Sequence, residues 1–277
     1  GELRACFLNV TSLRAHIGQV RELLSGYHSY DIFRVAETWL GPFVSDDVIQ
    51  VGRYKVFRQD RNLRGGGVAL YIKDNLKCTI LASSETQTSN SSGKPEVPEY
   101  IFCSVQVGGS EPVLVSVIYR PPAVSFTRNS NLLIDLRNFC SDYSHKIIIG
   151  DLNADLLKES SDAKFLSKLS AELSLQLVQH GATHHTPTSH TWIDLILVDD
   201  NDTVLDARNL PANFHSRHNL IDVCISCNFM KTDEKIIKYR NYKDICPNLL
   251  VQSLAGCDWT PFTVGTVDPE SALGCLC

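Results

Sequence analysis

Apolar residues gather into short runs along the first 227 residues, and the runs have the length of β-strands. They span residues 3–10, 31–38, 54–58, 68–72, 100–107, 113–119, 146–149, 192–198 and 220–227. The run at 31–38 lacks alternation, which indicates a strand buried on both faces. Glycines at 65–67 and 108–109 separate neighbouring runs and predict two hairpin turns, because glycine tolerates positive φ.

Helical spacing of apolar residues appears in three segments, 12–25, 131–140 and 163–177. Segment 83–98 is polar and predicts a loop. Strands in mixed order, with hairpins and a few covering helices, are typical of a layered α/β sandwich. The apolar pattern fades after about residue 229, apart from a candidate isolated helix over 244–259. We therefore expect one α/β domain over 1–229 and a linker or truncated extension over 230–277.

Composition supports a folded domain in a reducing compartment. The chain has 277 residues, of which 43% are hydrophobic, and no apolar run is long enough to predict a membrane span or a secretory leader. Its ten cysteines are scattered, and several lie inside apolar runs. Cys224 and Cys227 have metal-site spacing, but residues three apart on a strand point to opposite faces. We expect no shared ion there, and a chain that is not secreted.

Positive charge is concentrated in one hairpin, although the chain as a whole has a formal net charge of −5. Residues 51–77 include Arg58, Arg61 and Arg64 among seven Lys and Arg residues, against two Asp. A basic hairpin of this kind can bind phosphates locally on an otherwise acidic body. An ordinary solvated surface hairpin accounts for the same feature.

Polar residues lie at the ends of several predicted strands, where open α/β folds place ligand-binding groups. The candidates are Asn9, Glu37, Tyr119, Asp151, Asn153, Asp194 and His218. An aspartate inside the apolar strand 192–198 needs a partner, and a histidine is the natural one, since the carboxylate would orient it and raise its pKa. Carboxylate and amide oxygens also suit Mg²⁺.

Each candidate has a simpler interpretation when taken alone. Asn9 and the turn around Asp151 could be ordinary turn formers. His184, His185 and His190 lie in a Thr/Pro-rich segment without the spacing of a zinc site, which favours surface histidines. The combination of acid, amide and histidine at several strand ends is what favours an active site.

In this order, the motifs resemble those of the endonuclease/exonuclease/phosphatase superfamily, in particular the apurinic-endonuclease-like domain of jockey-type, LINE-like non-LTR retrotransposons. The resemblance covers residues 3–227. The matching segments are 8–13, 35–40, 52–58 with 64–68, 118–122, 149–153, 182–184, 193–197 and 216–221.

The resemblance implies a DNase I-like four-layer sandwich, with two mixed β-sheets flanked by helices. Glu37 and Asn9 would bind Mg²⁺ or Mn²⁺, and Asp151 would position or deprotonate the attacking water. Asn153 and Tyr119 would hold the scissile phosphate, while Asp194 would orient His218. The resemblance also implies that the enzyme nicks double-stranded target DNA in the nucleus to prime reverse transcription, and is otherwise cytoplasmic. Its other partners would be the element RNA and the reverse-transcriptase region of a longer polyprotein. Expected DNA contacts are Arg58, Arg61, Arg64, Arg120 and His184.

Two residues depart from the pattern of the family. Arg217 stands before the final histidine, where the family has Asp, so a positive charge replaces a negative one near the expected cation. Arg34 lies in a strand that should be buried, where it must reach solvent, find a partner or destabilise the sheet. Two alternatives therefore stay open beside the endonuclease. One is an inactive nucleic-acid-binding relic of the fold, and the other is a phosphoinositide or nucleotide phosphatase.

Overall fold

The computed structural model describes residues 1–26, 30–85, 97–122, 124–126, 130–212, 216–227 and 247–256. The chain divides into two compact units, Gly1–Met230 and Lys231–Cys277. The second unit contributes one described helix, α5 (Pro247–Ala255), which falls inside the predicted segment 244–259.

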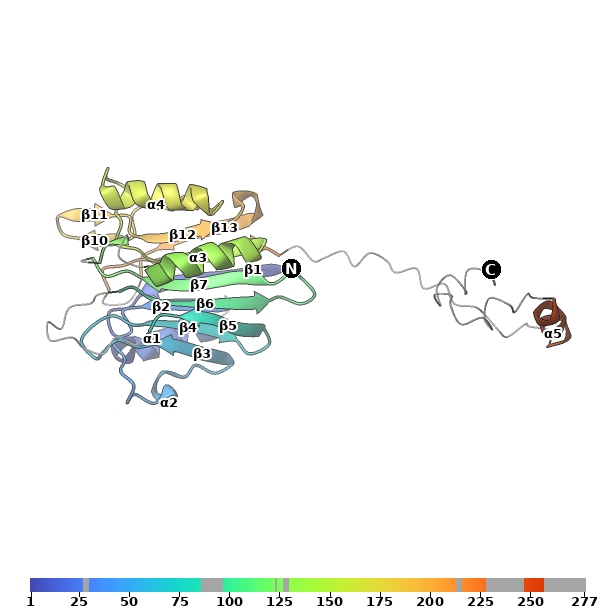
Figure 1. Ribbon diagram of the computed structural model, residues 1–277. Helices are drawn as coiled ribbons and strands as arrows, with labels where there is room; N and C mark the ends of the chain where they lie inside the picture. The colour runs from blue at the N-terminus through green and yellow to red at the C-terminus, as the bar shows by residue number, and fades with distance from the viewer. Residues whose placement is uncertain are drawn as a thin grey trace. The chain divides into compact units, whose positions relative to one another are not determined.

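The first unit contains two six-stranded sheets, shown in Figure 1. One sheet has the order β13-β14-β1-β2-β4-β3. Its strands are β1 (Glu2–Asn9), β2 (Ile32–Ala36), β3 (Tyr54–Gln59), β4 (Val68–Lys73), β13 (Val204–Leu210) and β14 (Leu220–Ser226). Within this sheet β1 and β2 are parallel, whereas β14 and β4 run antiparallel to them.

The other sheet has the order β5-β6-β7-β8-β12-β9. Its strands are β5 (Lys77–Ser83), β6 (Glu99–Gln106), β7 (Val113–Tyr119), β8 (His145–Asp151), β12 (Asp194–Val198) and β9 (Gln176–Leu177). Strands β7 and β8 are parallel, and β12 is antiparallel to β8. Both sheets are therefore mixed, as predicted.

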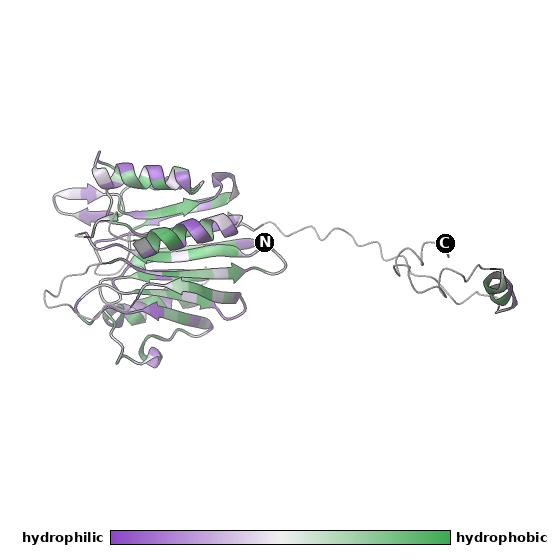
Figure 2. Cartoon of the chain, viewed as in Figure 1, coloured by the Kyte–Doolittle hydropathy of each residue, from purple (hydrophilic) through white to green (hydrophobic). Residues whose placement is uncertain are grey.

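Three apolar clusters separate four layers. The central cluster lies between the sheets, and hydrophobic colouring is accordingly concentrated along their strands in Figure 2. A second cluster packs the other sheet against α3 (Ser130–Asp142) and α4 (Ser161–Glu172). A third packs the first sheet against α1 (Leu13–Ser25) and the short α2 (Asp46–Ile49). The four-layer α/β sandwich expected from the resemblance is confirmed.

Several elements differ from those predicted. The predicted helix over 163–177 ends at Glu172, because Ser174 adopts a left-handed φ of 52° and the chain continues as β9. The apolar spacing of the helix runs on through Leu173, Leu175 and Leu177, which explains the overextension. The structure also adds β5, β13 and a two-stranded hairpin of β10 (His184–Thr186) and β11 (Ser189–Thr191), which the apolar pattern did not predict.

The cysteines of the described segments are all free. Cys224 and Cys227 are both buried, and only Cys227 belongs to the central cluster between the sheets. Within the described residues, no helix combines the length and the apolar character that crossing a membrane requires.

Arg34 is fully buried in β2, between Phe7 of β1 and Leu70 of β4. None of its three guanidinium nitrogens has a hydrogen-bond partner among the described residues. Burial lowers the pKa of Arg34 to about 9, although the sulfur atoms of Cys6 and Cys103 partly oppose this. Arg34 thus neither reaches solvent nor finds a hydrogen-bond partner among the described residues, so we expect it to destabilise the sheet.

Three of the seven positive charges of the basic hairpin, on Arg58, Arg61 and Lys73, pair with carboxylates outside it. Lys73 contacts Asp31 at 2.8 Å, and Arg61 contacts Glu99 at 3.2 Å. Lys55 donates to a backbone carbonyl instead. The local excess of positive charge counted along the sequence is therefore not presented to solvent as a whole.

Candidate active site at one edge of the sandwich

The predicted residues meet at one edge of the sandwich because of strand direction. Asn9, Tyr119 and Asp151 are the last residues of β1, β7 and β8, and Glu37 directly follows β2. Asp194 begins β12, which runs antiparallel to β8 and pairs Asp194 with Asp151. His218 precedes β14, which is antiparallel to β1. Ends of parallel strands and beginnings of antiparallel neighbours coincide at this edge.

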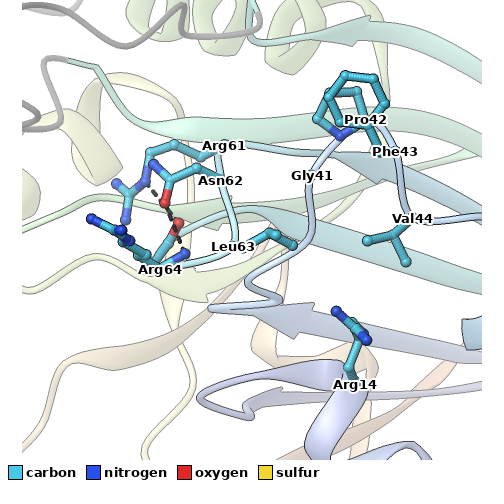
Figure 3. Close-up of a pocket in the computed structure, with 10 residues that line it drawn as sticks. Arg14, Gly41, Pro42, Phe43, Val44, Arg61, Asn62, Leu63 and Arg64 are labelled. Carbon is cyan, nitrogen blue, oxygen red and sulfur yellow. Dashed lines mark hydrogen bonds between the residues drawn. The ribbon is translucent and has the colours of Figure 1, made fainter.

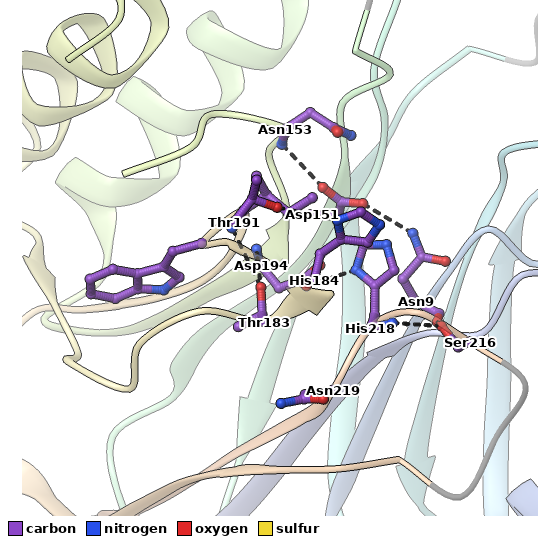
Figure 4. Close-up of polar contacts among 12 residues, drawn as sticks. Asn9, Asp151, Asn153, Thr183, His184, Thr191, Asp194, Ser216, His218 and Asn219 are labelled. Atoms are coloured by element: carbon purple, nitrogen blue, oxygen red, sulfur yellow. Dashed lines mark hydrogen bonds and ion pairs between the residues drawn. The ribbon is translucent and has the colours of Figure 1, made fainter. Parts of the chain in front are cut away.

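Three contacts join one sheet to the other at this edge, and Figure 4 shows two of them. Asn9 Nδ2 donates to Asp151 Oδ2 at 3.0 Å. His218 Nδ1 and Asp194 Oδ2 are 2.8 Å apart. The Tyr119 hydroxyl is hydrogen-bonded to Glu37. In each pair one residue comes from each sheet, so the site is a seam between the two sheets.

Glu37 is held by the turn that follows β2. Its φ of 57° is left-handed, which costs energy in a residue with a side chain. Its Oε2 accepts hydrogen bonds from Trp39 Nε1 at 2.5 Å and from Gly66 N at 3.1 Å. Gly67 has a φ of 82°, and a Cβ there would lie 2.4 Å from Thr38 Oγ1. The glycine turn predicted from the sequence thus fixes the carboxylate of Glu37.

Asp151 and Asn153 form a turn at the end of β8. Asp151 Oδ1 accepts from Asn153 N at 3.1 Å, and the Asn153 side chain donates to Arg120 O at 2.8 Å. Gly150 lets β7 and β8 approach closely, since a Cβ there would lie 2.0 Å from Ile118 O. The approach brings the adjacent residues Tyr119 and Asp151 into register.

Electrostatics at the edge favour a protonated His218. Burial disfavours its imidazolium, but the charge and hydrogen bond of Asp194 outweigh burial and raise the pKa of His218 to about 9. Burial and the carboxylate of Asp194 also raise the pKa of Asp151. Burial and Glu37 raise the pKa of Tyr119 well above its usual range, so the phenol keeps its proton. The edge therefore offers proton donors beside carboxylates.

His184 lies against His218, with 4.7 Å between the ring centroids. Its Nδ1 is 3.2 Å from Thr191 Oγ1. Burial and the neighbouring His218 lower the pKa of His184, so it is the neutral member of the pair. The structure thus places His184 within the candidate site, whereas sequence analysis expected it on a loop near DNA.

Two of the expected DNA-binding arginines do not fit that role. Arg120 is 1% exposed, donates to three backbone carbonyls and pairs with Asp162, so it anchors the turn instead. The Arg58 side chain is 13% exposed and pairs with Asp46 and Asp60. Both were assigned from a sequence in which the carboxylate partners could not be located.

The other two arginines lie beside the site. Arg61 pairs with Glu99, and its guanidinium lies 5.7 Å from the centroid of the Tyr119 ring. Arg64 is exposed, and no ion pair or hydrogen bond of its side chain occurs among the described residues. Of the four predicted arginines, Arg64 is the one presented to solvent.

Two groups of side chains could be considered as a metal site. Ligand atoms of Asp151, Asp194 and His218 lie within 4.8 Å of one another. The Nδ1 of His218 is already hydrogen-bonded to Asp194, however, and the imidazole is held protonated, so this group is a poor set of ligands. Glu37 and Asn9 offer a carboxylate and an amide oxygen at neighbouring strand ends, which is the donor chemistry that Mg²⁺ prefers.

Sequence analysis missed three residues that hold the site together. Trp39 donates to Glu37, as described above. The Ser216 hydroxyl donates to Asn9 O and accepts from His218 N, so one side chain links β1 to the histidine. Thr183 accepts from Asp194 N at 3.1 Å. All three lie inside the matching segments 35–40, 182–184 and 216–221, which was their sequence signal.

Part of the chain matches the model of a known protein family. Residues 113–222, which include Tyr119, Asp151, Asp194 and His218, match the family described as "Endonuclease-reverse transcriptase". The chain has the fold of solved proteins of the endonuclease/exonuclease/phosphatase family. No curated protein matched the sequence.

Several solved structures share the fold at low sequence identity. The endonuclease domain of TRAS1, a telomere-specific non-LTR retrotransposon, is 12% identical, with a TM-score of 0.58 over 82% of this chain and 99% of that one. The 3′ phosphatase NExo from Neisseria, bound to a product DNA hairpin, is 16% identical, with a TM-score of 0.60 over 81% and 99%. The human Nocturnin catalytic domain is 16% identical, with a TM-score of 0.59 over 82% and 94%.

Proposed function

We propose that this domain is a metal-dependent DNA endonuclease that nicks one strand of target DNA and leaves a 3′-hydroxyl for reverse transcription. The observation that carries the proposal is the seam, where three contacts between the sheets bring carboxylates, an amide, a phenol and a protonated histidine to one edge. The match to an endonuclease–reverse transcriptase family and the likeness to the TRAS1 endonuclease support the retrotransposon context.

The side chains at the seam have complementary tasks in phosphodiester hydrolysis. Asp151, fixed by Asn9 and by the backbone of Asn153, would accept a proton from the attacking water. His218 would stabilise the negative charge that develops on the phosphate, since Asp194 keeps it positive. Tyr119 retains its proton and would donate to a phosphate oxygen near the leaving group. Asn153 would hold the phosphate beside them.

Glu37 and Asn9 would hold the divalent ion, Mg²⁺ or Mn²⁺. Asn9 is the last residue of β1, Glu37 directly follows the parallel strand β2, and Glu37 accepts hydrogen bonds from two N–H donors. When bound, the ion would supply Lewis-acid polarisation of the phosphate. We further propose that double-stranded DNA, the element RNA and a reverse-transcriptase region are the partners of the domain, and that it acts in the nucleus.

A plasmid-nicking assay tests the proposal. Supercoiled plasmid with Mg²⁺ should convert to open circles with the wild type, and Glu37→Ala should reduce the rate by at least about 100-fold, because the ion loses its carboxylate. Glu172→Ala is the matched control, since Glu172 is an exposed glutamate paired with Arg137 away from the edge. Equal nicking by the wild type and Glu37→Ala would refute the proposal, and so would nicking that survives EDTA.

An inactive relic is the second candidate, because Arg217 stands beside His218 and its side chain is exposed. Its charge acts on His184 and contributes to the lowered pKa of that residue. A relic would bind DNA without nicking it, whether or not residue 217 is changed.

Release of phosphate from inositides or nucleotides without DNA nicking would instead indicate the phosphatase alternative.

A further inference from the structure

A hollow of about 870 Å³ lies beside the seam and is not used by the mechanism above. Two short segments form its walls, residues 41–44 after β2 and residues 61–65 between β3 and β4, and Arg14 of α1 closes it (Figure 3). The two segments approach each other closely, since a Cβ added to Gly41 would lie 3.6 Å from Leu63 Cγ. Its volume falls within the range of roughly 300–1,000 Å³ typical of ligand sites.

The hollow combines exposed apolar surface with unpaired positive charge. Phe43 is 101% exposed and Leu63 is 57% exposed. Arg14 and Arg64 are also exposed, and no ion pair involving either side chain occurs among the described residues. This differs from the paired Arg58 and Arg61, whose charges are neutralised within the fold.

The walls of the hollow share their backbone with the candidate active site. Arg61 lines the hollow and also lies over the Tyr119 ring. Gly66, next to the hollow, donates to Glu37. Leu13, the residue before Arg14, donates its N–H to the carbonyl of Thr38, the residue after Glu37. A strand whose scissile phosphate lies at the seam therefore has neighbouring nucleotides within reach, since backbone phosphates of one strand repeat every few ångströms.

The chemistry of these walls favours an unpaired base over a paired one. A base within a duplex is stacked on both faces, whereas a base out of the stack offers a face to aromatic and apolar side chains. Arg14 and Arg64 supply positive charge that can neutralise the adjoining phosphates. A purely apolar partner would leave both arginines without counter-charges.

We propose that this hollow receives one unpaired nucleotide of the DNA strand that passes through the seam, with its base against Phe43 and Leu63 and its phosphates between Arg14 and Arg64. The inference rests on the proposed nuclease function for the identity of the polymer. The hollow would then select target sites at which a base leaves the stack easily, such as a mismatch, a bulge or a flexible step.

Binding measured in EDTA tests this pocket separately from cleavage. Fluorescence anisotropy would compare two DNA hairpins that differ by one unpaired nucleotide in one strand. We expect the wild type to bind the bulged hairpin about tenfold more tightly, the size of one base–aromatic stack. Phe43→Ala should remove this preference and leave binding to the paired hairpin unchanged. Val48→Ala, an exposed apolar residue of α2 outside the hollow, is the control that should keep the preference.

Salt dependence tests the arginines. Arg14→Ala and Arg64→Ala should each lower the slope of log affinity against log salt by about 1 on the bulged hairpin. Arg4→Ala, at the opposite end of β1, is the control and should leave the slope unchanged. Unchanged slopes for both pocket variants would contradict the proposed contacts of Arg14 and Arg64 with DNA phosphates.

The outcomes distinguish a failure of the pocket proposal from a failure of the proposed nuclease function. If the wild type shows no preference for the bulge, or if Phe43→Ala keeps it, the pocket proposal is overturned even when plasmid nicking occurs. If the preference depends on Phe43 but no nicking is seen with Mg²⁺, the pocket stands and the proposed nuclease function fails. Because the Phe43 side chain is fully exposed, its loss should not unfold the domain.

Discussion

Arg61 and Arg34 both carry a guanidinium into protein interior between the two sheets. Arg61 lies near the edge and meets Glu99, a residue of the other sheet, at 3.2 Å. Arg34 lies in the middle of the sandwich and meets no hydrogen-bond partner among the described residues. The same chemical group therefore has a carboxylate partner at the edge of the sandwich and no hydrogen-bond partner among the described residues in the middle.

The difference shows what a seam between sheets can support. At the edge, turns bring polar side chains of both sheets together, so that Asn9 meets Asp151 and His218 meets Asp194. In the middle, the side chains beside Arg34 on the neighbouring strands belong to the apolar central cluster. A charge there keeps the full cost of leaving water.

The largest expected effect comes from breaking a pair at the edge. Asp194→Asn should lower the nicking rate by about 1,000-fold, because His218 loses the carboxylate that orients it and keeps it positive. The melting temperature should change little. Asp199→Asn is the matched control, since Asp199 forms the same kind of pair with His145 at the other end of β8. A similar loss of activity in both variants would contradict the role of the edge.

Removing the unpaired charge of Arg34 should make the protein more stable. Arg34→Met keeps a long side chain but leaves no cation in the central cluster, so the free energy of unfolding should rise by about 2–4 kcal/mol. Urea denaturation monitored by tryptophan fluorescence would measure it. Arg137→Met, on the exposed face of α3, should change stability by less than about 0.5 kcal/mol. A less stable Arg34→Met variant would mean that Arg34 has a stabilising partner.

Stability measured as a function of pH tests the edge at Glu99, the partner of Arg61. Burial raises the pKa of Glu99 from 4.5 to about 7, although Arg61 opposes this. A raised folded-state pKa stabilises the fold fully below pH 4.5, and the contribution is lost as the pH rises through 7. Glu99→Gln cannot titrate, so its stability relative to the wild type should increase by about 3 kcal/mol between pH 4.5 and 7.5. A difference that is flat or falls across this range would contradict the burial effect.

The smallest expected effect is at the rim of the site. Arg217→Asp replaces an exposed cation beside His184 and His218 with the acid that the family pattern has there, and should raise nicking about tenfold. Arg217→Ala separates loss of the cation from gain of the carboxylate. If the wild type and both variants fail to nick plasmid, the relic interpretation gains.

Strand ends were predictable because the physics there is local. A run of buried residues followed by Asn9, or by Asp151 and Asn153, marks the point where the chain leaves the core, and the candidates assigned from these points converge on one edge. The mixed sheets also followed from hairpins and covering helices. The exposed strands β5 and β13 were missed, since their mixed burial leaves no continuous apolar run.

Partners of charged residues were not predictable because they are distant in sequence. Arg120 pairs with Asp162 and Arg61 pairs with Glu99, each about forty residues away along the chain. Counting charge over 51–77 ignored Asp31, Asp46 and Glu99, which neutralise much of it. Without coordinates, a cation that anchors a turn and a cation that binds phosphate look the same.

The division of the candidate active-site residues between two sheets would link catalysis to assembly. A chain in which each sheet has formed on its own would hold Asn9 and His218 on one surface and Asp151 and Asp194 on another, with no functional group complete. Activity would appear only when the two surfaces dock, and would vanish when they part, before any strand is lost. In a denaturant titration, nicking should therefore disappear ahead of the far-ultraviolet circular dichroism signal.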